Sequence, residues 1–277
     1  MAKSVHDVAA ATEAILDLPA RAKLPVDGYR SFFSTSFNGL RLGFVDPAVW
    51  RFPPDLWVPS EEAKKQHDAA YHEAREKMQS LGAEVIYPVT LPQPSELTVG
   101  DDYTPFIVNC YEHEETANEF FRDFVKPGTQ VHDLASVVEF NKKHAEKCLP
   151  KDAPDQSWLV RAVENRPSEA QYRDAFQHML QVGRDQGLRK VLDEHNLDVV
   201  IAPMDSPVCS LSTASGYPIS NVPLGRYHLK GQLSRPFGLA ALARPEAEGT
   251  LIKFMSAFEA NFPARVIPEQ LLSETRN

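Results

Sequence analysis

Two histidines and two neighbouring acids form one group of side chains whose types could do chemistry. His67, Asp68, His72 and Glu73 lie in a stretch predicted to be helical, and imidazole and carboxylate groups are common ligands of metal ions. A separation of five residues turns the two histidines about 140° apart around a helix, so they do not share a face as ligands at i and i+4 do. We therefore predict a solvated helix surface here and no metal site.

A thiol with a nearby imidazole forms a second group. Cys110, His113 and Glu114 have the spacing of a nucleophile and its base one helical turn apart. Cys110 also falls on an apolar stripe, so we predict a buried core thiol rather than a nucleophile. Asp133, which follows His132, precedes a helical pattern and is predicted to cap that helix. The sequence contains neither a Gly-X-Ser-X-Gly nucleophile elbow nor a Gly-rich phosphate loop.

The loop from Met204 to Thr213 is a third candidate. It follows the apolar run Leu197–Pro203, which is typical of a buried strand. Open α/β sheets bind their ligands beyond the carboxyl ends of their strands. The loop therefore lies where a substrate could bind. The alternative is a surface loop in which Asp205 serves as a turn or cap residue.

The elements that must position this loop are short apolar runs followed by a helix. The runs at 197–203, 216–225 and 236–245 each end at Pro or Gly, and an amphipathic helix that ends near Phe262 follows them. This pattern is typical of buried strands with the chain returning across one face of a sheet. We expect this stretch to be the centre of the fold.

A second set of elements precedes it in the chain. A strand at 40–45, a helix at 60–81 that Ser60 caps, and a strand at 83–87 predict a parallel crossover unit. Further helices are predicted, each by its caps and apolar spacing, at 4–16, 104–125, 133–141 and 168–195. We predict one α/β domain over residues 1–277, with a mixed, mostly parallel twisted sheet flanked by helices.

Composition and charge exclude several classes of function. The chain has 277 residues, of which 43% are hydrophobic, and a net charge of −9, so nucleic-acid binding has no electrostatic support. No apolar run approaches the roughly 20 residues that span a bilayer, and no signal peptide is recognisable, so we expect a cytoplasmic protein. The three cysteines form no metal or disulfide pattern, and we predict reduced, mostly buried thiols and no cofactor.

Several segments, in order along the chain, resemble those of the amidase signature family, and more narrowly of its fungal members. Residues 1–9 resemble the "GPMARSVADVA" segment of that family, and residues 198–203 its "DALLAPT" strand. Other segments resemble its "GLRIGV", "LGAEVV", "TLADLIAFN", "AGYPAITVPLG" and "PFGLALLGRP" blocks, at 39–45, 81–86, 132–141, 216–225 and 236–245. The resemblance covers nearly the whole chain and implies the C-terminal part of an amidase-signature domain.

The resemblance implies an α/β fold that hydrolyses amide bonds with a Ser nucleophile, a second Ser in a cis peptide, and a Lys. In the family, the loop equivalent to 204–213 lines the substrate pocket, so Asp205 and Thr213 are predicted to contact substrate. The catalytic Ser and Lys residues of the family lie upstream of the segment that residues 1–9 resemble. We therefore expect no catalytic residue in this chain, and an amide substrate only when an N-terminal portion is supplied.

No substitute for that catalytic set is evident in the sequence. There is no Gly-Gly-Ser-Ser run, and Ser31, Ser34 and Ser36 lack the glycines that an oxyanion loop needs. Two alternatives remain open. One is a non-catalytic amidase-like protein that binds a partner, for example as a homo-oligomer that covers exposed sheet surface. The other is an enzyme that uses different residues.

Overall fold

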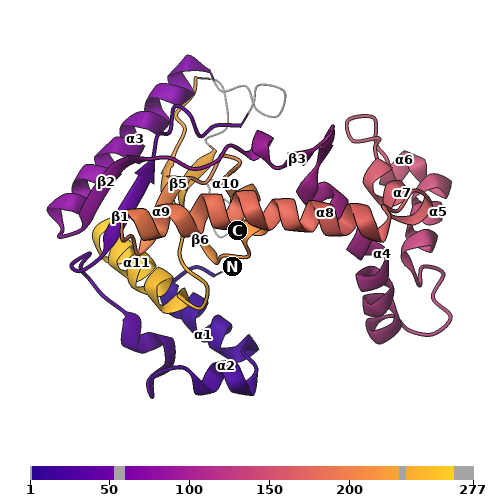
Figure 1. Cartoon of the computed structure of the whole chain (residues 1–277), viewed down its shortest axis with the longest axis horizontal. Coiled ribbons are helices and arrows are strands. Elements are labelled where there is room, and N and C mark those ends of the chain that lie inside the picture. The colour runs from indigo at the N-terminus through magenta and orange to yellow at the C-terminus, as the bar shows by residue number, and fades with distance from the viewer. Residues whose placement is uncertain (1, 53–59, 231–234, 265–277) are drawn as a thin grey trace, which may run out of the picture. The chain divides into compact units, whose positions relative to one another are not determined.

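The computed structural model describes residues 2–52, 60–230 and 235–264. Inter-residue contacts divide the chain into two compact units, which Figure 1 shows as ribbons. The sheet unit comprises residues 1–94 and 183–277, and the helical unit comprises residues 95–182. Our prediction of one domain over 1–277, the C-terminal part of a larger domain, stays a prediction.

The sheet unit is built on five strands in the order β2-β1-β5-β7-β6. Strand β1 pairs in parallel with β2 and β5, whereas β7 is antiparallel to both β5 and β6, so β7 alone opposes the common direction. The strands are Arg41–Val45 (β1), Glu84–Val89 (β2), Val199–Pro203 (β5), Ile219–Arg226 (β6) and Pro236–Leu242 (β7). The mixed, mostly parallel α/β sheet predicted from the sequence is confirmed.

Helix α3, Glu61–Ser80, makes the predicted crossover between β1 and β2. Ser60 caps it by accepting a hydrogen bond from the backbone N–H of Ala63, and the chain leaves it through Gly82 at φ +98°. The fully buried Tyr71 joins this helix to the sheet, because its hydroxyl lies 2.9 Å from the Val45 carbonyl and 3.1 Å from that of Ile201. The helix thus fixes the relative positions of β1 and β5.

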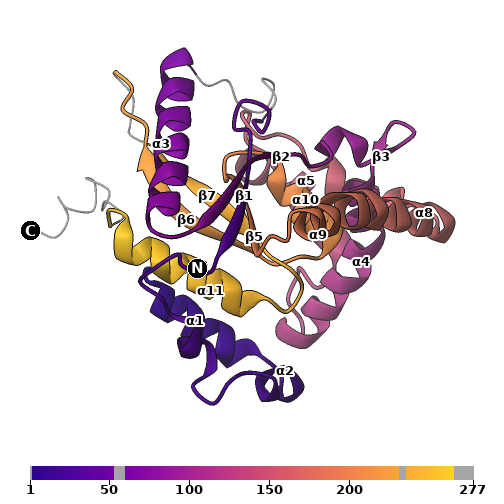
Figure 2. The same ribbon diagram turned by 60° about the vertical axis from the view of Figure 1, so that its left-hand side comes forward.

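Helix α11, Glu248–Asn261, covers the same face of the sheet as α3, and α1, Val5–Ile15, packs outside α11 (Figure 2). Ser4 caps α1, and the backbone N–H of Val5 donates to the Glu259 carboxylate. The core beneath these helices includes the fully buried Phe44 of β1, Ile201 of β5, Leu239 of β7 and Phe254 of α11 itself. Strand β5 is buried along its whole length, as the apolar run predicted.

Helices α9, Arg189–Glu194, and α10, Val208–Ser215, lie against the opposite face (Figure 2). Our prediction of one helix over 168–195 is wrong. Helix α8 ends at Met179, a wide-turn segment runs from Leu180 to Leu188, and the backbone of Gly187 leaves helical geometry at φ −97° and ψ −111°. Gly187 weakens a helix interior by about 1 kcal/mol relative to Ala, so the predicted helix is least stable where it breaks.

Two short elements follow α1 that the sequence did not predict, α2 at Leu18–Ala22 and the 3₁₀ turn η1 at Gly28–Phe32. A second 3₁₀ turn, η2, covers Pro94–Glu96 at the junction of the two units. No helix in the described part of the chain is long and apolar enough to cross a membrane.

The helical unit holds a two-stranded hairpin and five helices within its described residues. They are Thr98–Val99 (β3), Asp102–Tyr103 (β4), Thr104–Phe124 (α4), Leu134–Lys143 (α5), Ala145–Cys148 (α6), Ser157–Glu164 (α7) and Glu169–Met179 (α8). Helix α4 packs on α8 through stacked Tyr111 and Tyr172 rings, 4.3 Å apart. The predicted apolar stripe of α4 is buried only in its first half, because Phe120 and Phe124 are 57% and 75% exposed.

Candidate functional site at the end of strand β5

The carboxyl end of β5 carries a sharply turned loop that leads into α10. The Ser206 hydroxyl donates to the Pro203 carbonyl at 2.6 Å and accepts from the backbone N–H of Val208 at 3.4 Å. Ser206 is fully buried, so these bonds hold the turn in one conformation. The preceding residue, Asp205, is therefore placed by rigid neighbours, and its side chain is half-buried.

His67 of α3 lies near this loop, and our prediction of a solvated surface for it is wrong. Its side chain is only 4% exposed, and its ring stacks on Tyr71 and lies 5.2 Å from the Phe237 ring of β7. The spacing of Ala63, His67 and Tyr71 is a sequence signal for the burial of His67, because residues four apart share one face of a helix. A histidine on that stripe is buried with it.

Burial dominates the electrostatics of this cluster. It lowers the pKa of His67, which the neighbouring Asp68 and Asp205 carboxylates raise in part. It raises the pKa of the Asp205 carboxyl, an effect that His67 and Arg235 oppose. It also raises the pKa of Tyr227 to about 12, and the charge of Asp205 adds to that shift. Asp205, His67 and Tyr227 therefore interact at the end of β5.

An ion pair between Arg51 and Asp68 closes one side of this cluster. Both Asp68 oxygens accept from the Arg51 guanidinium, and Asp68 Oδ1 also lies 3.5 Å from Nδ1 of His67, which is too long for a strong hydrogen bond. Asp68 favours a proton on His67 most, Arg51 opposes it, and Asp205 favours it more weakly, so the charges of His67 and Asp205 are coupled. The two can act as an acid–base pair or hold a polar ligand.

Thr213 is not part of this buried cluster. It is exposed on α10, as is Cys209 one turn earlier, whereas Leu211, Ser212 and Ala214 face the core. Among the described residues, no hydrogen bond or ion pair joins Thr213 to Asp205 or His67. The structure therefore brings His67 to Asp205 and leaves Thr213 on the outer side of the same segment.

The remaining candidates have structural roles in the helical unit. Cys110 is 1% exposed, and burial raises the pKa of its thiol, which disfavours the thiolate that a nucleophile needs. Asp133 caps α5, as predicted, by accepting from the backbone N–H of Ser136. The prediction of mostly buried thiols fails for the exposed Cys209. Within the residues that the structure describes, no three His, Cys, Asp or Glu side chains are grouped to hold a metal ion.

The arrangement of this sheet and its covering helices is that of amidase-signature hydrolases. The peptide amidase from Stenotrophomonas maltophilia superimposes with a TM-score of 0.73 at 25% identity, over 97% of this chain and 54% of that chain. An amidase family protein from Bacillus anthracis str. Ames gives a TM-score of 0.72 at 20% identity, over 97% of this chain and 49% of that one. Neither a protein-family model nor a curated protein sequence matches the chain.

A more distant structure shares the fold alone. A bacterial aryl acylamidase of the amidase signature family gives a TM-score of 0.58 at 18% identity, over 94% of this chain and 52% of that chain. The chain thus spans about half the length of the solved structures that it matches.

Proposed function

We propose that the chain is the C-terminal part of an amidase, a hydrolase that cleaves carbon–nitrogen bonds of amides. The observation that carries this proposal is the superposition of 97% of the chain on 54% of the S. maltophilia peptide amidase at 25% identity. The ordered segments that resemble the amidase signature family support it independently of the fold. Their likeness to fungal members supports a fungal-type amidase acting in the cytoplasm.

In this proposal, the catalytic Lys, both Ser residues and the Gly/Ser-rich loop belong to an N-terminal portion that this chain does not supply. The sheet unit serves as scaffold and as one wall of the substrate pocket. Asp205 and Thr213 contact the substrate, Asp205 from the buried cluster at the end of β5 and Thr213 from the exposed side of α10. Alone, the chain is inactive, because binding surface without a nucleophile supplies little of the rate enhancement.

The experiment treats the purified 277-residue chain with a fluorophosphonate and assays it with a panel of aryl and fatty amides. We expect no serine labelling and no turnover. In parallel, the DNA that precedes the Met1 codon is translated, and we expect it to encode a Lys and a Gly-Gly-Ser-Ser run. Serine labelling with turnover by the 277-residue chain would show that the nucleophile lies within it and would refute the proposal.

A second candidate is a non-catalytic amidase-like protein that binds a partner. The exposed apolar side chains of Ile15, Leu18 and Val26 favour it, since such residues promote association. This candidate predicts a stable oligomer or complex in solution. A cooperatively melting monomer that binds no partner would count against it.

A further inference from the structure

The helix α2 has a feature that the isolated sheet unit does not explain. It has five residues, none of them buried, and Leu18 at its start is 82% exposed. Helices this short are not stable by themselves in water and depend on packing. Asp17 caps α2, and Lys23 pairs with Glu246 at 2.8 Å, but exposed pairs contribute little. Leu16 and Leu24, on either side of α2, pack against the core, whereas the described residues leave the outer side of α2 uncovered.

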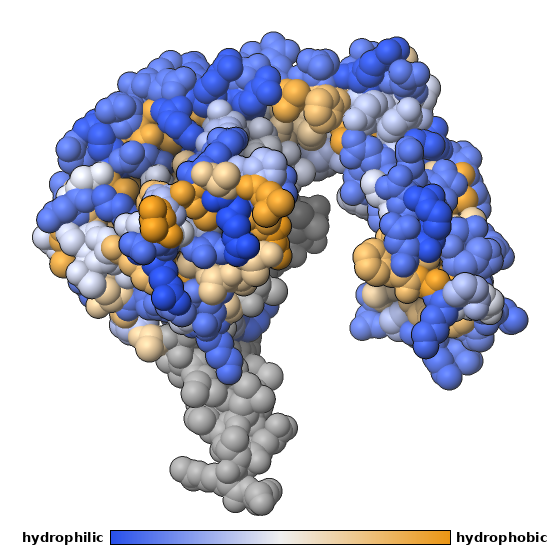
Figure 3. Space-filling view, turned by 90° about the horizontal axis from the view of Figure 1, so that it is seen from below, coloured by the Kyte–Doolittle hydropathy of each residue, from blue (hydrophilic) through white to orange (hydrophobic). Residues whose placement is uncertain are grey.

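Exposed apolar side chains gather around the same element. Ile15, Leu18 and Val26 are 83%, 82% and 106% exposed, and they fall within twelve residues of sequence. Figure 3 looks at the molecule from the α1–α2 side and shows hydrophobic residues beside hydrophilic ones there. Single exposed apolar residues are ordinary, whereas a contiguous group of them marks an interaction surface.

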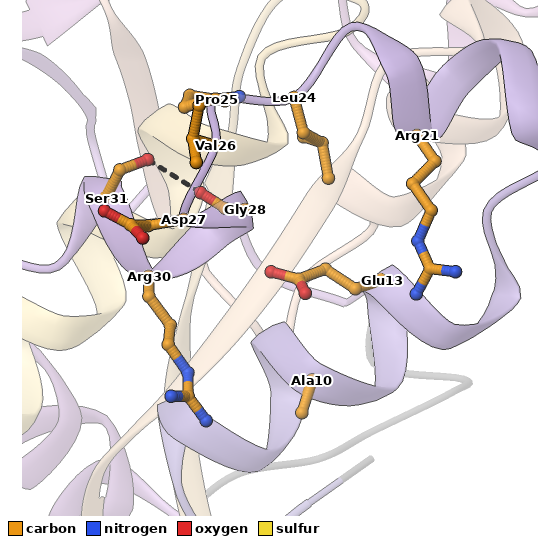
Figure 4. Close-up of a pocket in the computed structure, with 10 residues that line it drawn as sticks. All are labelled: Ala10, Glu13, Arg21, Leu24, Pro25, Val26, Asp27, Gly28, Arg30 and Ser31. Carbon is orange, nitrogen blue, oxygen red and sulfur yellow. Dashed lines mark hydrogen bonds between the residues drawn. The ribbon is translucent and has the colours of Figure 1, made fainter.

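A cavity of about 700 Å³ opens between α1, α2 and η1 beside these residues. Leu24 and Val26 point into it, and Glu13 and Arg21 border it from α1 and α2 (Figure 4). The Glu13 carboxylate is already engaged, because it accepts the backbone N–H of Tyr29 and so fixes η1 on α1. The cavity has a fixed wall, and its lining combines the apolar Leu24 and Val26 with charged side chains that include Asp27, which suits an inserted side chain that is partly apolar and partly polar.

Two cations on this surface have no partner among the residues that the structure describes. The guanidinium groups of Arg21 and Arg30 both line the cavity, and neither makes a hydrogen bond or an ion pair with a described residue. Arginine beside apolar side chains is enriched at protein interfaces, where its planar group pairs with a partner carboxylate. The surface therefore combines apolar anchors with unpaired positive charge.

We propose that this surface, made by Ile15, Leu18, Leu24 and Val26 with Arg21 and Arg30, docks the other half of an amidase fold. The inference rests on the proposed function. The partner that we expect on this surface is the remaining part of the amidase fold, because this chain covers only 54% of the matched peptide amidase. A second copy of this chain fits less well, because two chains of net charge −9 repel each other. The occupant supplies apolar side chains to the cavity and carboxylates to the arginines.

The test measures how fast single cysteines on this surface react with a maleimide. Leu18→Cys and Val26→Cys are made in a Cys148→Ser, Cys209→Ser background, which leaves only the buried Cys110. Val49→Cys is the matched control, in the same unit and 56% exposed. Each variant is prepared as the 277-residue chain and again with the polypeptide encoded by the DNA that precedes Met1, as one chain or two according to the reading frame.

We expect labelling at positions 18 and 26 to slow by roughly tenfold or more in the completed protein, and labelling at position 49 to stay unchanged. Arg21→Glu with Arg30→Glu should restore fast labelling when the halves are separate chains, by weakening their association roughly tenfold or more. A melting transition equal to that of the parent shows that each variant is folded.

Three results would overturn the inference. If the completed protein hydrolyses amides while positions 18 and 26 still label at the rate of the 277-residue chain, the proposed function stands and the docking surface is wrong. If labelling of the 277-residue chain slows as its own concentration rises, a second copy occupies the surface. If the preceding DNA encodes no amidase half, the proposed function and the inference fail together.

Discussion

Replacement of His67 by Phe should make the protein less sensitive to mild acid. The folded protein binds a proton at His67 less readily than the unfolded chain does, because burial lowers the pKa of this imidazole. In the unfolded chain it titrates near pH 6.5. As the pH falls below that value the unfolded state takes up a proton that the folded state does not, so His67 destabilises the fold on acidification.

The magnitude follows from proton linkage. Each pH unit between the unfolded and folded pKa values removes about 1.4 kcal/mol of stability. His67 is 4% exposed, so solvent screens this effect little. Phe keeps the ring between Tyr71 and Phe237 but cannot bind a proton. Between pH 7.5 and pH 5.5 the His67→Phe variant should therefore lose less unfolding free energy than the parent protein, by an amount that a single proton limits to about 1.4 kcal/mol.

Urea unfolding at several pH values, followed by far-UV circular dichroism, measures this difference. His6→Phe is the control, since the side chain of His6 is 54% exposed at the start of α1. This control shows how the loss of an exposed imidazole by itself changes the measured pH dependence. Equal losses of stability for the parent and the His67→Phe variant would refute the reasoning, because they would show that His67 takes up its proton alike in both states.

Other substitutions test separate parts of the sheet unit. Burial raises the pKa of the Asp205 carboxyl, so its ionised form is disfavoured in the fold. The Asp205→Asn variant should therefore gain unfolding free energy over the parent protein at pH 7, and gain less at pH 4. A variant that is less stable at pH 7 than the parent protein would contradict this. Tyr71→Phe should cost about 1–3 kcal/mol of unfolding free energy, since two buried strand carbonyls lose their donor, and an unchanged urea midpoint would oppose it. Gly183→Ala should lower the melting temperature and cost about 1–3 kcal/mol, because the new Cβ would lie 2.5 Å from that of Ala214; a neutral effect would mean that the helices can separate there.

Much of the fold could be predicted because the signals are local. Ser60 and Asp133 cap the helices that they precede, as predicted, and a Ser168–Gln171 capping box opens α8. A cap acts within one turn, so sequence spacing alone identifies it. The strand, helix, strand order of β1, α3 and β2 likewise required parallel pairing, which the register of Leu42 with Val85 confirms.

The errors concern how elements meet. The helix that the sequence predicts over 168–195 runs through Gly187. Only the packed structure shows that the backbone departs from helical geometry at this residue. Phe120 and Phe124 continue the apolar stripe of α4 in sequence, yet they are exposed, because periodicity identifies a face and not the length of the neighbour that covers it.

The sequence by itself determined β5 and β7, since runs buried on both faces are apolar throughout, and it singled out Asp205 at the end of β5. Only the tertiary structure decided which side chains surround that residue. His67 and Tyr227 reach it from α3 and from the end of the β6 strand region, 138 and 22 residues away in the chain. Their burial, which sets their protonation, arises from contacts between distant segments that no local spacing encodes.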